Sequence, residues 1–149
     1  MARFVFSMQN LLNMKEKLEE QEKNNYSRAN MLYQEALDEL EQIKARRQRE
    51  EESLKQCLKE TIDVREIRRR EEAVEIVKLY IKQQQLVVMQ REQEVQEARE
   101  KLAEAMKERK TFEKLREKAF QAFMEEENKK EQKEVDELVS YRYGVKTQQ

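Results

Sequence analysis

The residue types that carry most enzyme chemistry are nearly absent from this sequence. It has no histidine, the side chain that shuttles protons near neutral pH and binds metals most often. Its single cysteine, Cys57, can form neither an internal disulfide nor a thiolate zinc site, which indicates a reducing compartment. The 32 Asp and Glu residues are abundant, but general acid–base catalysis prefers enclosed, desolvated carboxylates, which the helical layout described below does not provide. We therefore expect no enzymatic activity, no cofactor and no metal site.

Two clusters of basic residues are the other candidates for a binding chemistry, because Lys and Arg on one face attract nucleic acid. The clusters read KARRQR at 44–49 and REIRRR at 65–70. Each is followed at once by glutamates, at 50–52 and at 71–72. Opposite charges three or four residues apart on a helix pair with one another. The spacing therefore favours ion pairs within helices, and we expect no nucleic-acid partner.

The composition predicts the elements that must position these residues. The 149 residues contain no proline and one glycine, Gly144, whereas a sheet domain builds its turns largely from Gly, Pro, Asn and Asp. The 31 basic and 32 acidic residues leave a net charge of −1, and 38% of the chain is apolar, unlike an acidic or basic disordered tail. Strong helix formers dominate the remainder, so we expect an all-α fold of long helices.

The spacing of apolar residues predicts two helices. Alternating steps of three and four from Phe4 to Ile43 meet apolar residues at eight of twelve positions, which describes an imperfect heptad seam. The same steps from Ile67 to Phe123 meet apolar residues at twelve of seventeen positions, which describes a better one. Between the two seams, Asp63 precedes a glutamate by three residues, as in a capping box, so the Asp63 carboxylate should accept a hydrogen bond from the Glu66 amide.

We predict a single domain, residues 1–149, built from these two helices. Its parts are a first helix over about 4–59, a turn at about 60–63, a second helix over about 64–140 and a frayed end at 141–149. Gly144 suits a C-terminal cap. Because a short turn makes neighbouring helices antiparallel, the expected fold class is an antiparallel coiled-coil hairpin whose second helix is the longer one.

A bend at Thr61 and Ile62 also predicts which residues face one another. In an antiparallel hairpin, the numbers of facing residues should sum to roughly 123. Leu11 then lies opposite Phe112, and Leu18 lies opposite Ala105. This register gathers all five phenylalanines at the open end of the hairpin: Phe4, Phe6, Phe112, Phe120 and Phe123. The phenylalanines either close the hairpin as a local core or form a docking tip.

Two parts of the second helix are not fully covered by the first. One part has more apolar residues than the contact between the helices can bury, and the other extends beyond the end of the first helix. In residues 73–89 the seam takes Val74, Val77, Ile81 and Val88, and the apolar residues left over are Ile76, Leu79, Tyr80, Leu86 and Val87. Exposed apolar patches mark binding sites, although the first helix could bend over this patch or two hairpins could associate there. Beyond about residue 120, no part of the first helix is expected to pack against the second helix. We call this segment the overhang, and it either frays or is held by something else.

The sequence predicts a cytoplasmic protein. No stretch approaches the ~20 consecutive apolar residues that span a bilayer. The first residues also lack the long apolar run and small-residue cleavage site of a secretory signal peptide.

Three segments of the chain resemble a known family. Residues 4–16 read FVFSMQNLLNMKE, residues 64–69 read VREIRR, and residues 112–118 read FEKLREK, followed by a D-E pair at 136–137. In this arrangement the chain resembles the FliJ family of flagellar export proteins over nearly its whole length. The resemblance implies a two-stranded antiparallel coiled coil similar to the central stalk of rotary ATPases.

The resemblance also implies partners and surfaces. Members of this family act in the cytoplasm at the membrane-embedded flagellar type III export apparatus, where they bind the hexameric export ATPase FliI, the export gate protein FlhA and substrate chaperones. The implied ATPase-binding residues are Phe4, Leu11, Leu12, Lys15, Phe112, Leu115, Arg116, Phe120 and Phe123. The implied gate-binding residues are Ala73, Ile76, Val77, Tyr80 and Gln84.

Two other classes of protein share part of this pattern. A structural or tethering coiled coil would continue its seam through residues 57–66 without a break in phase and would pair in parallel. A stalk subunit of a rotary ATPase would share the hairpin but normally carries further elements.

Overall fold

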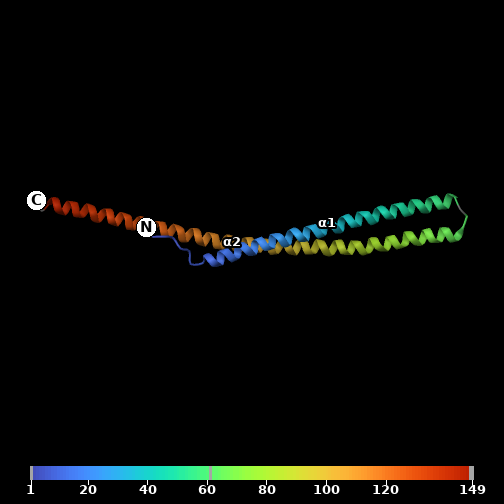
Figure 1. The fold of residues 1–149 in the computed structure, drawn as a ribbon, viewed down its shortest axis with the longest axis horizontal. Helices are drawn as coiled ribbons and strands as arrows, with labels where there is room; N and C mark the ends of the chain where they lie inside the picture. The colour runs from blue at the N-terminus through green and yellow to red at the C-terminus, as the bar shows by residue number, and fades with distance from the viewer. Residues whose placement is uncertain (1, 61, 148–149) are drawn as a thin grey trace. The chain divides into compact units, whose positions relative to one another are not determined.

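The computed structural model describes residues 2–60 and 62–147 and consists of two long helices (Figure 1). Helix α1 spans Gln9–Glu60 and helix α2 spans Val64–Thr147, with 52 and 84 residues respectively. No strand occurs within the described residues. The predicted all-α fold, with two long helices packed antiparallel and the second one longer, is confirmed.

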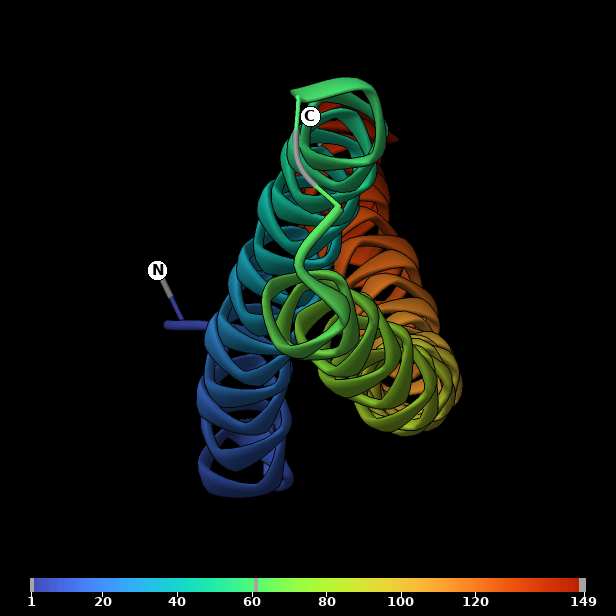
Figure 2. The ribbon, with the colours of Figure 1, turned by 90° about the vertical axis from the view of Figure 1, so that its right-hand side faces the viewer.

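The chain reverses direction between Glu60 and Val64 (Figure 2). Ile62 and Asp63 are not helical, and the predicted turn residue Thr61 lies outside the described residues. The Asp63 side chain caps α2 by accepting a hydrogen bond from the backbone amide of Arg65 at 3.0 Å. Asp63 therefore caps the helix as expected, and the hydrogen bond described here goes to the second amide of the helix, a group that has no helical partner.

The first helix begins at Gln9, five residues later than expected. Residues 2–6 have no regular structure and 7–8 form a turn, in which the Gln9 amide donates to the Phe6 carbonyl at 3.1 Å. Aromatic and β-branched residues at 4–6 favour extended backbone over helix. Because the chain is not helical at Phe6, this side chain can point inward, and it is only 7% exposed.

The second helix continues to Thr147, past its expected end at residue 140. Gly144 lies inside this helix and does not adopt the positive φ angle that a left-handed cap needs. A glycine inside a helix lowers helix stability but does not end the helix. The last two residues of the predicted frayed end, 148–149, lie outside the described residues.

The chain divides into two compact units, which we call the hairpin unit (residues 21–103) and the terminal unit (1–20 with 104–149). The hairpin unit contains the connection and the helical segments on either side of it (Figure 1). The terminal unit contains the start of α1 and the last part of α2. The expectation of a single domain stays a prediction.

The hairpin unit has an apolar core at the seam predicted for the second helix. Val77 is 1% exposed and packs with Leu40 and Ile81, and Ile43 and Val88 lie against this cluster. Residues at every predicted seam position from 67 to 98 are buried or half-buried. The predicted register is confirmed here by two contacts between the helices. Arg70 donates to Ser53 at 3.3 Å, and Gln84 donates to the Ala36 carbonyl at 3.0 Å.

The terminal unit follows the predicted register but not the predicted seam on α1. Lys15 faces Glu108 with 2.8 Å between Nζ and Oε2, as the register requires. However, Leu11 and Leu18 are 44% and 37% exposed, and the inward positions are taken by Leu12 and Glu19. A straight α-helix drifts relative to a seven-residue repeat, and the apolar pattern at the start of α1 is too weak to hold the helix on the predicted stripe.

Candidate functional site

Three of the five phenylalanines that were predicted to gather are in contact in the terminal unit. The Phe4 ring lies 5.2 Å from that of Phe120, edge to face, and 5.5 Å from that of Phe123. The Arg116 guanidinium lies 5.6 Å from the Phe4 ring centroid and also donates to the side-chain oxygen of Gln9 at 3.0 Å. These ring distances are those of favourable aromatic and cation–π pairs. The nonhelical start of the chain is therefore held against α2 by its aromatic side chain.

The nine residues expected to bind the ATPase all lie in the terminal unit, but they differ in exposure. Leu11, Leu115 and Phe120 are between 39% and 45% exposed, and Arg116 is also exposed. The half-buried members are Phe4, Lys15, Phe112 and Phe123. Leu12 is 3% exposed, so it supports the surface from within. We call the other eight residues the aromatic end.

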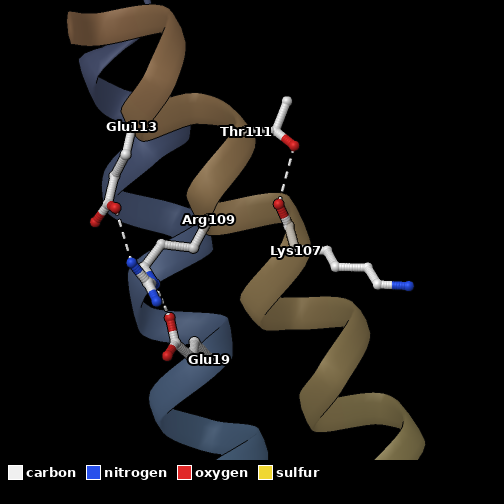
Figure 3. A network of polar contacts seen from close by, with 5 residues as sticks. All are labelled: Glu19, Lys107, Arg109, Thr111 and Glu113. Atoms are coloured by element: carbon white, nitrogen blue, oxygen red, sulfur yellow. Dashed lines mark hydrogen bonds and ion pairs between the residues drawn. The ribbon is translucent and has the colours of Figure 1, made fainter.

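A charged network lies within the terminal unit beside this surface (Figure 3). The Arg109 guanidinium reaches between two carboxylates, pairing with Glu19 of α1 and with Glu113 of its own helix, the latter at 2.8 Å. Both carboxylates raise the pKa of Arg109, Glu113 more than Glu19. The Glu19 side chain is only 7% exposed, so its charge needs this partner.

Sequence reasoning missed Glu19, although a signal was present. Arg109 occupies a position in the seam predicted for the second helix, where its guanidinium must face the other helix. An inward guanidinium requires an acceptor opposite. The predicted register places residue 14 opposite Arg109, and a search of α1 for carboxylates within five residues of that position would have found Glu16 and Glu19 without choosing between them.

The five residues expected to bind the gate all lie in the hairpin unit, and the structure separates them into two groups. Val77 and Gln84 are 1% and 8% exposed and belong to the packing between the helices, so the expectation that they form a binding surface needs correction. They occupy seam positions, which the packing of α1 covers. Ile76 and Tyr80 are 48% and 42% exposed, and Ala73 is half-buried beside them. We call these three residues the middle surface.

A cation borders the middle surface. The Arg46 guanidinium of α1 lies 5.9 Å from the centroid of the Tyr80 ring. A second pair of this kind lies elsewhere in the hairpin unit, where Arg99 sits 6.0 Å from the Tyr26 ring and hydrogen-bonds its hydroxyl at 3.5 Å. That hydrogen bond, with a smaller effect from Asn30, lowers the pKa of Tyr26.

The expected apolar surplus on α2 is present. Leu79, Leu86 and Val87 are 53%, 66% and 38% exposed, in addition to Ile76 and Tyr80. The overhang is also solvent-exposed: every side chain from Asn128 to Val145 is exposed, including those of Val135 and Leu138.

The basic clusters form ion pairs along their own helices, as the spacing favours. Arg47 pairs with Glu51 at 2.9 Å in the first cluster. In the second cluster, Arg70 and Arg69 pair with Glu66 at 3.4 and 3.9 Å, instead of with the glutamates that follow the cluster. The absence of a nucleic-acid partner stays a prediction.

Neither a metal cluster nor a membrane span occurs in the described part of the chain. No group of three or more His, Cys, Asp or Glu side chains among residues 2–60 and 62–147 is arranged to hold a metal ion. Over the same residues, neither helix is long and apolar enough to cross a membrane. Cys57 is a free cysteine and is buried.

Comparison with known proteins identifies the family. The model of the FliJ family, described as flagellar FliJ protein, matches residues 4–148. The chain belongs to the FliJ family. A curated relative, the flagellar FliJ protein of Bacillus subtilis (strain 168), is 27% identical over 135 residues, which cover 91% of this chain and 92% of the relative. Comparison with solved structures gave no match. Membership of the FliJ family associates the chain with flagellar protein export.

Proposed function

We propose that this protein is an accessory component of flagellar type III export that acts without chemistry of its own, in the cytoplasm at the inner face of the cell membrane. It binds the export ATPase FliI and the export gate protein FlhA, and it assists the delivery of substrates and their chaperones. The observation that carries the proposal is the family match, which runs from residue 4 to residue 148 and so includes both surfaces described above.

The aromatic end is the proposed ATPase-binding surface. It combines exposed apolar side chains, Leu11, Leu115 and Phe120, with the cation of Arg116. Aromatic residues and Arg are enriched where proteins bind one another, because they combine a large apolar area with a directional polar contact. The contacts of Phe4 with Phe120 and Phe123 fix this surface before a partner arrives, which lowers the entropy cost of binding.

Substitutions in the aromatic end should weaken binding of the ATPase. Phe112→Ala and Phe123→Ala each remove a half-buried ring, and we expect a loss of at least about tenfold in affinity, the scale of a strong interface residue. Co-purification with FliI, and its rate of ATP hydrolysis with and without this protein, measure the effect. Tyr80→Ala is the matched control, because it removes a ring from the hairpin unit. Unchanged ATPase binding in both phenylalanine variants would contradict the assignment.

The middle surface is the proposed gate-binding surface. Ile76 and Tyr80 offer a small apolar area with a phenol group, and Arg46 adds a positive charge beside the ring. The proposal now excludes Val77 and Gln84 as direct contacts, because both are buried against α1.

Substitutions on the middle surface should give the reciprocal result. Tyr80→Ala should reduce the affinity for the cytoplasmic part of FlhA by about tenfold, because an interface tyrosine loses both ring packing and its hydroxyl contact. Phe123→Ala serves as the control and should leave this affinity unchanged. Titration calorimetry of both variants against FlhA and FliI completes the comparison. Loss of both partners in either variant would indicate unfolding instead of separate surfaces, so helicity is measured in parallel by circular dichroism.

A further inference from the structure

One face of α2 in the hairpin unit carries a row of residues that the packing with α1 leaves exposed. The residues follow alternating steps of three and four, as in a heptad seam. The row is Arg65, Arg69, Glu72, Ile76, Leu79, Gln83, Leu86, Gln90, Gln93, Glu97 and Glu100, and all eleven are exposed. Val77, Ile81 and Gln84, which lie between these positions, face α1 and are buried. This second row, which we call the outer row, is a potential seam without a partner in the hairpin unit.

Ile76 and Glu72 correspond to Gln90 and Gln93, so the order of residue types in the outer row is only partly symmetric about its middle residue, Gln83. Its immediate neighbours in the row are two leucines, Leu79 and Leu86, which are 53% and 66% exposed. The residues from Gln83 to Gln90 carry no charge, although 42% of the chain is charged. The two ends of the row have opposite charges, since Arg65 and Arg69 stand at one end and Glu97 and Glu100 at the other.

We propose that a second copy of this chain packs antiparallel on the outer row, with the two-fold axis beside Gln83. A two-fold interface brings each surface against itself, so its residues must complement one another when the direction is reversed. Reversal about Gln83 places Leu79 against the partner's Leu86. It also places Arg69 against the partner's Glu97, and Arg65 against the partner's Glu100. Charge complementarity therefore selects the antiparallel orientation, because parallel pairing would set arginine against arginine and glutamate against glutamate.

The end residues are available for such pairs. The Arg69 side chain is 74% exposed, and its contact with Glu66 is long, at 3.9 Å. Glu100 accepts a hydrogen bond of 3.5 Å from the neutral Gln96 amide. Exposed ion pairs of this kind exchange partners at little cost. Because they lie at the rim and salt screens them, association should weaken as the salt concentration rises.

The first experiment measures the mass of the full chain in solution. Sedimentation equilibrium over a concentration series should show a monomer–dimer equilibrium at low salt. The double variant Arg65→Glu/Arg69→Glu should weaken the dimer by at least about tenfold, since two attractive pairs become repulsive on each side of the axis. Adding Glu97→Arg/Glu100→Arg to that variant should restore it. A monomer at all concentrations, or no recovery in the combined variant, would overturn the proposal.

The second experiment tests orientation and register. In a Cys57→Ala background, Gln83→Cys should form a disulfide between two copies, because the two residues meet at the axis. Gln90→Cys is the matched control on the same row and should not, since its two copies would lie about 20 Å apart along the helices, whereas a disulfide requires Cα atoms within about 7 Å. Cross-linking of both variants would indicate a parallel pair, and cross-linking of neither would indicate another contact, so either result refutes this interface. Circular dichroism confirms that every variant remains helical.

Discussion

At the scale of single residues, the terminal unit shows why burial cannot be read from side-chain type alone. Leu11 and Leu12 are adjacent and identical, yet one is 44% exposed and the other 3%. Seven residues after Leu12, the inward position holds a glutamate, which the cation of Arg109 neutralises. Removing one member of an inward ion pair leaves the other charge without compensation, whereas replacing both by apolar residues is often neutral. Glu19 and Arg109 should therefore be considered as a pair in any redesign of this surface.

The two leucines give a direct test of this packing. Leu12→Ala should lower the free energy of unfolding by about 3 kcal/mol, because it deletes three carbons from a buried site. Leu11→Ala should change it by only about 0.5 kcal/mol, the scale of a surface substitution. Urea denaturation followed by circular dichroism measures both. Equal losses would mean that α1 is rotated from the position described, and the reverse order would place Leu11 in the seam.

At the scale of elements, periodicity predicted the helices well and their ends less well. The second seam was found because long-range spacing reports which face is buried, and the residues from Ile67 to Ala98 on it are inward as expected. The predicted start of the first helix is wrong because the heptad count included Phe4, which is half-buried by its contacts with Phe120 and Phe123 and does not belong to a helix. Gly144 predicts a C-terminal cap, but it lies inside α2 without a left-handed conformation.

The cap of α2 is an element whose contribution can be measured. Asp63→Ala should reduce the free energy of unfolding by about 1 kcal/mol, because the amide of Arg65 loses its acceptor. Asp63→Asn should retain most of the stability, since asparagine caps helices about as well. Thermal and urea denaturation compare the two variants. If both lose the same amount, the charge of Asp63 matters more than its hydrogen bond.

At the scale of the whole molecule, the sequence predicted the class of fold from composition and the family from three short segments. The spacing also divides the implied gate-binding residues by exposure, because Val77 and Gln84 occupy seam positions and Ile76 and Tyr80 do not, whereas the family resemblance alone grouped all four together. That division depends on the rotation of α2 about its axis, which packing against α1 decides. The same rotation leaves the outer row exposed. The type of any single residue in the row does not indicate that the row is exposed.

Ile76 belongs both to the middle surface and to the outer row. A side chain buried against a second copy of the chain could not also touch the proposed gate partner, so the two proposed associations would compete for one patch. If both proposals hold, pairs would store surplus protein and would dissociate as the gate binds free chains. The supply of gate-competent protein would then vary less than its rate of synthesis.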